Sequence, residues 1–264
     1  MKTFSFVLLS VLFLFSSGAF AEQGQSPSPY NVGGMENADG GTISGIVLFK
    51  GEKPASQPIK EIAGNAFCKH CYSGDVPNND SVVIGHNGSN ETVANVLVYV
   101  SKGLEGKQFK APAHSVLLDQ VGCMYQPHVV AVMVGQTLEI RNSDATLHNV
   151  MCMPSHNPFF NFGMPSKDQV VEKVFRQPEF KMNFRCSMHP WMSAYVHVLP
   201  NPFFAVTQSD GTFKITGLPA GEYVITVLHE SSTLEAQDKD ISVKLESRQT
   251  KQISFTYKPK TIAK

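Results

Sequence analysis

The sequence has no net charge and no long apolar run after its first residues. Its 264 residues carry 22 basic and 22 acidic side chains, a balance that gives no basis for nucleic-acid binding. The early run FVLLSVLFLF is shorter than the roughly 18 apolar residues of a membrane helix, and no later segment approaches that length. We therefore expect no integral membrane span in the mature chain.

The N-terminal residues have the layout of a secretory signal peptide. Lys2 precedes the apolar run, and Ala19-Phe20-Ala21 supplies a small-residue cleavage site. We predict that residues 1–21 are removed, which places the protein in the periplasm or outside the cell. An uncleaved run that serves as a membrane anchor is the alternative. No cysteine follows the cleavage site, which argues against a lipid anchor there.

The sequence also lacks a long amphipathic helical pattern after residue 21, whereas short β-branched and aromatic runs recur to the end. Residues 22–40 are rich in Gly, Pro, Ser and Asn, and we predict a flexible leader that does not pack. Strand patterns then begin with TISGIVLF and include VANVLVYV, KMNFRC and GEYVITVL. The predicted fold class is all-β.

Cysteines are few and odd in number: five in a chain predicted to be exported. Cys68 and Cys71 are followed by Tyr72 rather than histidine, which excludes c-type haem attachment. The segment YSGDVPNND excludes the helix that a thioredoxin-like pair needs. We predict a disulfide from Cys68 or Cys71 to Cys123, and spacing alone does not decide between the two.

The run CSMHPWM carries the most specific chemical signal. It places Cys186, His189 and Met192 on one loop between two strand patterns, and His148 follows an Asn-Ser-Asp turn about forty residues earlier. A thiolate, two imidazoles and a weak thioether form the ligand set of blue copper, which accommodates both Cu(I) and Cu(II). We predict one type 1 copper held by His148, Cys186, His189 and Met192.

Asn149 is predicted to tie the two ligand segments together by hydrogen bonds around the sulfur. Structural zinc is the competing interpretation, but zinc disfavours a methionine ligand. A second copper site at Met151, Cys152, Met153 and His156 is a further alternative. An apolar patch that includes Trp191 is predicted to surround an exposed edge of His189, as a docking face for a redox partner protein.

These motifs resemble known families. Residues 125–198 resemble the cupredoxins of the plastocyanin and amicyanin group, which implies a Greek-key β-sandwich, copper binding and electron transfer. Most of the mature chain resembles bacterial periplasmic plastocyanin-like proteins, some called methylamine utilisation proteins, through GCMYQPHVVAV, SDATLHNV, CSMHPWMSAYVHV and GLPAGEYVITVLHE. The tail DGTFKITGLPAGEYVI resembles the carboxypeptidase regulatory-like, prealbumin-type β-sandwich.

The order of these motifs predicts a cupredoxin joined to a prealbumin-like sandwich, and we expect it to be inserted there. The cupredoxin would occupy residues 105–203, and the two parts of the other sandwich residues 41–104 and 204–264. The expected function is one-electron transport, without enzymatic activity, because no second copper centre is evident. The alternative is a copper storage or delivery protein without a role as a redox carrier.

Overall fold

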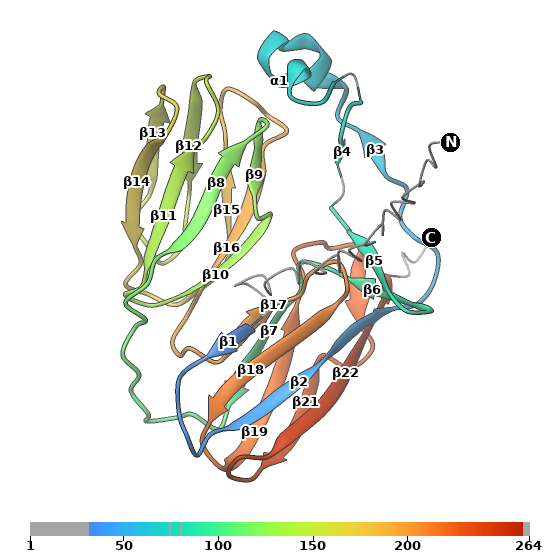
Figure 1. Ribbon diagram of the computed structural model, residues 1–264, viewed down its shortest axis with the longest axis vertical. Helices are drawn as coiled ribbons and strands as arrows, with labels where there is room; N and C mark the ends of the chain where they lie inside the picture. The colour runs from blue at the N-terminus through green and yellow to red at the C-terminus, as the bar shows by residue number, and fades with distance from the viewer. Residues whose placement is uncertain (1–31, 74, 80, 261–264) are drawn as a thin grey trace, which may run out of the picture.

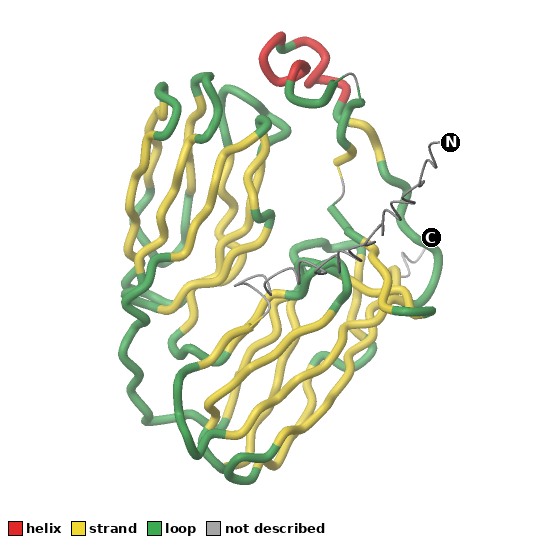
Figure 2. The backbone as a smooth tube through the Cα atoms, viewed as in Figure 1, coloured by secondary structure: helices red, strands yellow, loops and turns green. Residues whose placement is uncertain are grey.

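The structure is a computed structural model that describes residues 32–73, 75–79 and 81–260. The chain is nearly all β, as predicted, and folds into packed sheets (Figure 2). The predicted signal peptide lies outside the described residues. Within those residues, no helix has the length and apolar character needed to cross a bilayer.

Two β-sandwiches lie side by side (Figure 1). We call strands β8 to β16 the inner sandwich, because they lie inside the sequence of the other. Its five-stranded sheet has the order β10 (Val129–Met133), β16 (Ser193–Leu199), β15 (Glu179–Arg185), β12 (His148–Cys152) and β13 (Phe160–Met164). Its four-stranded sheet has the order β14 (Gln169–Val174), β11 (Thr137–Asn142), β8 (Val116–Val121) and β9 (Met124–Gln126).

Alternation along the strands builds the core of the inner sandwich. In β12 the side chains of His148, Val150 and Cys152 are buried, while Asn149 and Met151 are half-buried. Successive side chains of a strand point to opposite faces, so His148 faces the same side as the apolar core residues. An imidazole is thus directed into the interior by the same pattern that places Val150 there.

The outer sandwich is made of strands from both sides of the inner one. Its seven-stranded sheet contains β1 (Val32–Gly34), β18 (Thr212–Leu218), β2 (Gly41–Phe49), β22 (Thr250–Pro259) and β20 (Leu234–Ala236) in that order, with β6 (Asn90–Val93) pairing β2 and β5 (Ile84–Asn87). Its four-stranded sheet has the order β17 (Phe204–Val206), β7 (Leu97–Lys102), β19 (Gly221–Leu228) and β21 (Asp240–Leu245). Strands β2 and β7 thus pair with strands that follow residue 203.

A small buried cluster joins the two sandwiches. Val129, Ala131 and Leu199 of the inner sandwich pack with Leu97 and Val206 of the outer one. All are buried, and burial of such side chains contributes about 1.5–3 kcal/mol each for the larger ones. The two sandwiches therefore share an apolar contact.

One excursion of the chain leaves the outer sandwich and reaches the inner one. Its two ends pair as the short strands β3 (Gln57–Pro58) and β4 (Asn78–Asn79). Between them lie the 3-10 helix η1 (Lys60–Gly64) and the helix α1 (Ala66–His70). We call residues 59–72 the capping segment. Ile59 and Ile62 are buried in the core cluster of the inner sandwich. This part of 41–104 was expected in the outer sandwich, but its apolar side chains and a disulfide attach it to the inner one.

The predicted flexible leader, residues 22–40, also differs from expectation where the structure describes it. Strand β1 pairs in parallel with β18, and the Gly34 N–H donates to the Pro202 carbonyl at 3.0 Å. A Cβ at Gly33 would collide with the Phe204 carbonyl oxygen. The glycines that predicted a flexible leader instead allow two backbone segments to approach each other closely.

A buried histidine makes the stability of the fold depend on pH. His197 on β16 is 1% exposed, its Nδ1 accepts from the Lys181 N–H at 3.2 Å, and burial lowers its pKa from 6.5 to about 3. Between these values the unfolded chain binds one more proton, so stability falls as the pH drops below 6.5. We expect His197→Asn to reduce the loss of unfolding free energy between pH 7 and 5 by about 2 kcal/mol. Denaturant titrations at both pH values check this, and equal losses in the two proteins would contradict it.

Candidate metal centre

Three predicted ligands meet at one end of the inner sandwich. His148 begins β12, while Cys186 and His189 lie on the loop of the hairpin formed by β15 and β16. The Nδ1 atoms of the two histidines lie 3.0 Å apart, and the Cys186 Sγ lies 3.6 Å from the His189 Nδ1. The three side chains are between 0% and 3% exposed.

The hairpin loop is closed by its own backbone. The Cys186 N–H donates to the Met192 carbonyl at 3.2 Å, and the Met192 N–H donates to the His189 carbonyl at 2.9 Å. Strands β15 and β16 pair up to Arg185 and Ser193, directly outside this loop. The loop therefore holds Cys186 and His189 in a fixed relation. Met192 is fully buried in the same core cluster as Cys186.

The surroundings of Cys186 favour its thiolate form. Burial raises its pKa, but hydrogen bonds from His148, His189 and the Asn149 backbone outweigh this effect and lower it to about 6. The Asn149 N–H donates to the sulfur at 3.4 Å. Because this pKa lies below neutral pH, much of Cys186 is thiolate at pH 7. The thiolate is the form of cysteine that binds metal.

Asn149 links the two ligand segments. Its Oδ1 accepts from the Ser187 N–H at 3.2 Å and from the Ser187 hydroxyl at 2.8 Å. Tyr125, which the sequence did not single out, donates its hydroxyl to the Asn149 carbonyl at 3.1 Å. These contacts tie the start of β12 to the hairpin loop.

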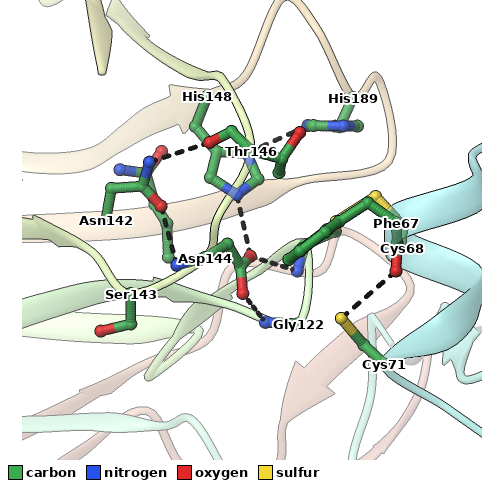
Figure 3. A network of polar contacts seen from close by, with 12 residues as sticks. Phe67, Cys68, Cys71, Gly122, Asn142, Ser143, Asp144, Thr146, His148 and His189 are labelled. Carbon is green, nitrogen blue, oxygen red and sulfur yellow. Dashed lines mark hydrogen bonds and ion pairs between the residues drawn. A yellow bond between two sulfur atoms is a disulfide. The ribbon is translucent and has the colours of Figure 1, made fainter. Parts of the chain in front are cut away.

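Asp144 is the second residue that sequence reasoning missed. Its carboxylate lies 2.9 Å from the His148 Nε2 and accepts from the Gly122 and Cys123 N–H groups at 2.8 Å each (Figure 3). Burial raises its pKa, but these hydrogen bonds outweigh that effect and hold the pKa below its usual value. The carboxylate fixes the outer nitrogen of His148 and leaves Nδ1 directed toward Cys186 and His189. The sequence feature that could have identified Asp144 is its position in the Asn-Ser-Asp turn, four residues before His148.

The disulfide joins Cys68 of the capping segment to Cys123, while Cys71 is an exposed free thiol. Both disulfide sulfurs lie within 4.8 Å of a ring nitrogen of His189. The bridge therefore brings the capping segment against the candidate metal centre.

The exposed edge predicted for His189 is absent, because the capping segment covers it. His189 is 2% exposed, and its Nε2 lies 3.2 Å from the Asn65 Nδ2. Trp191 is half-buried, its ring lies 5.2 Å from the His189 ring, and its Nε1 donates to the Cys123 carbonyl at 3.0 Å. The prediction of an exposed His189 edge is therefore wrong, whereas docking of a redox partner protein near Trp191 and His189 stays a prediction.

The alternative cluster around residue 152 is divided between core and solvent. Cys152 is 1% exposed, and burial, with Glu179 nearby, raises its pKa to about 12. Met153 is 76% exposed, and the His156 N–H binds Glu179. Burial and surface positions thus separate the side chains that a second metal site would need.

The observed donor set fits a single metal ion. Ligand atoms that share an ion lie about 3–4 Å apart, since metal–nitrogen and metal–sulfur bonds measure about 2.0–2.3 Å. The ligand atoms of His148, Cys186 and His189 lie within 4.8 Å of one another, and two of their separations are 3.0 and 3.6 Å. The other His, Cys, Asp and Glu clusters within the described ranges each include His148 or His189. One thiolate and two imidazoles suit copper or zinc.

No protein-family model matches the chain, and no curated protein matches it. The solved structures that it resembles include a methionine-to-alanine mutant of amicyanin in its Cu(I) form, with 20% identity over 38% of this chain and 97% of that chain, at a TM-score of 0.29. The purple cupredoxin from Nitrosopumilus maritimus matches 33% of this chain and 99% of its own, with 23% identity and a TM-score of 0.27. The copper-containing nitrite reductase from Thermus scotoductus SA-01 matches 37% of this chain, with 21% identity and a TM-score of 0.29, and the match covers 25% of the reductase. At these identities and TM-scores, the likenesses carry no argument about function.

Proposed function

We propose that this protein is a one-electron carrier with a single type 1 copper bound by His148, Cys186, His189 and Met192. The observation that carries the proposal is the convergence of two imidazole Nδ1 atoms and the Cys186 sulfur in a buried site. Bound copper would supply a centre that accepts and releases one electron. Methionine as the fourth ligand favours copper over zinc.

The protein's own residues would keep the ligands still when the charge at the centre changes. Asp144 fixes His148, and the Asn149 N–H binds the Cys186 sulfur. The hairpin loop is held at both ends by β15 and β16. Ligands that move little require little reorganisation, which is what fast electron transfer needs.

The same arrangement supports a carrier rather than an enzyme or a delivery protein. An oxidase or reductase would need a further metal centre, whereas each candidate cluster in the described part of the chain contains His148 or His189. Delivery would need ready release, and the ligands are almost fully buried. The proposal also includes export by a signal peptide at residues 1–21. It keeps the division of the chain into residues 41–104, 105–203 and 204–264, although residues 59–72 pack against the inner sandwich.

A reversible redox titration of the copper-loaded full chain tests the carrier function. We expect one electron per copper and retention of the metal through repeated cycles in the presence of a Cu(I) chelator. Rapid transfer of Cu(I) to the chelator after the first reduction would contradict a carrier and favour storage or delivery.

A further inference from the structure

A buried carboxylate lies where the two sandwiches meet. The Glu230 side chain, two residues after the end of β19, is 3% exposed, and neither of its oxygens has a hydrogen-bond partner among the described residues. Three imidazoles lie near it: His229 beside it in the chain, His128 directly before β10, and His197 on β16. We call these four residues the histidine cluster. His197 lies on the same face of β16 as Leu199, which packs against the outer sandwich.

Hydrogen bonds hold two of these imidazoles in the neutral form. The His197 Nδ1 accepts the Lys181 N–H at 3.2 Å. In the outer sandwich, the His229 Nδ1 accepts the Ser231 N–H at 3.0 Å. A ring nitrogen that accepts a backbone N–H carries no proton, so each ring is neutral while its bond lasts. Burial also lowers the pKa of both histidines, to about 3 for His197.

The third imidazole, His128, is the cation that faces Glu230. Its Nε2 lies 3.3 Å from the Glu230 Oε1, and its Nδ1 lies 3.2 Å from the Ser193 carbonyl oxygen. A carbonyl oxygen and an ionised carboxylate can only accept, so both nitrogens of His128 carry a proton. Burial raises the pKa of Glu230, but the contact with His128 outweighs this effect and keeps the pKa below its usual value. The cluster therefore contains one buried ion pair and two neutral imidazoles.

We propose that the histidine cluster is an acid-sensitive switch that holds the two sandwiches together near neutral pH and releases them in acid. Protonation of His197 and His229 breaks their backbone hydrogen bonds and places three imidazolium groups around one carboxylate. Lys181 is a further cation, and its Nζ lies 3.5 Å from the Glu230 carbonyl oxygen. The other titratable side chains that face the cluster are Tyr99 on β7, Lys239 before β21 and Tyr257 on β22. The tyrosines are neutral in acid, so these groups do not offset the added positive charge.

The switch acts below about pH 6.5, the usual pKa of histidine. In the closed form His197 and His229 stay neutral there, whereas both bind protons once the sandwiches separate. Their lowered pKa values in the closed form thus make the contact less stable as the pH falls. Two linked protons raise the equilibrium constant for opening about 60-fold between pH 6 and pH 5, and a single proton raises it about 8-fold.

Amide hydrogen exchange of the metal-free full chain, resolved by NMR, measures the opening. The Lys181 and Ser231 N–H groups report on the inner and the outer sandwich. After correction for intrinsic exchange rates, we expect the protection of both to fall about 60-fold between pH 6 and pH 5. The amides of Ile140 in β11 and Ile225 in β19, which lie in central strands, should stay better protected at pH 5. Equal protection of all four amides would assign the loss to global unfolding and overturn the switch.

His197→Asn separates a linked switch from two independent titrations. The asparagine side-chain oxygen can accept the Lys181 N–H, but it takes up no proton. The fall in Ser231 protection should shrink from about 60-fold to about 8-fold, although the substitution lies in the other sandwich. His229→Asn should have the reciprocal effect on the Lys181 amide.

His86→Asn is the matched control, because His86 is exposed on β5. It should leave the pH response of both amides as in the wild type. A Ser231 response that is unchanged in His197→Asn, together with an unchanged Lys181 response in His229→Asn, would show that the two histidines titrate separately and would overturn the proposal.

Discussion

Asp144→Ala is expected to destabilise the inner sandwich and to weaken metal binding together. The substitution leaves the N–H groups of Gly122 and Cys123 and the Nε2 of His148 without their acceptor. Buried donors without partners cost about 1–3 kcal/mol each, so we expect a loss of about 3 kcal/mol in unfolding free energy. Copper affinity should fall by about 10–100-fold, because His148 loses the contact that orients it.

Glu179→Ala is the matched control for this effect. Glu179 is also a buried carboxylate of the inner sandwich, and it accepts from the backbone N–H groups of Ser155 and His156 and from the Asn157 side chain. Its removal should destabilise the sandwich by a similar amount and leave copper affinity unchanged. Denaturant unfolding and competitive chelator titrations measure the two quantities. Normal copper affinity in Asp144→Ala would contradict the orienting role of the carboxylate.

Removal of the disulfide should have the second large effect. The bridge closes a loop with a sequence separation of 55 residues, and the chain-entropy relation for such a loop gives about 4 kcal/mol. In Cys68→Ala/Cys123→Ala we expect that loss in the unfolding transition of the inner sandwich. The capping segment should also detach more often, which would let diethyl pyrocarbonate modify His189.

Cys71→Ala controls for the loss of a cysteine outside the bridge, because Cys71 is an exposed free thiol. It should match the wild type in stability and in protection of His189. Peptide mapping by mass spectrometry locates the modified histidine. Full protection of His189 in the double variant would show that the apolar contacts of Ile59 and Ile62 hold the capping segment without the bridge.

The sequence predicted the elements of the site that carry their own local signal. Cys186, His189 and Met192 lie close together in the chain, and alternation along β12 directs His148 inward. The all-β fold followed from strand patterns that recur at short intervals. The roles of these residues as copper ligands stay predictions until metal is measured.

The parts that could not be predicted depend on long-range packing. Asn65 has no local feature that points to His189, and only folding of the excursion brings the two together. The same holds for the closed His189 edge, since a loop residue is ordinarily expected to be exposed. Strand β1 was missed because Gly33 and Gly34 are typical of flexible segments and also of close backbone contacts.

The visible absorption spectrum of the mature protein during titration with Cu(II), compared with Cys186→Ala, tests the central claim most directly. The account predicts an intense charge-transfer band that saturates at one copper per chain and is absent in the variant, because the band requires the Cys186 thiolate. A colourless wild-type protein, or a band of equal intensity in Cys186→Ala, would contradict a type 1 copper at this site.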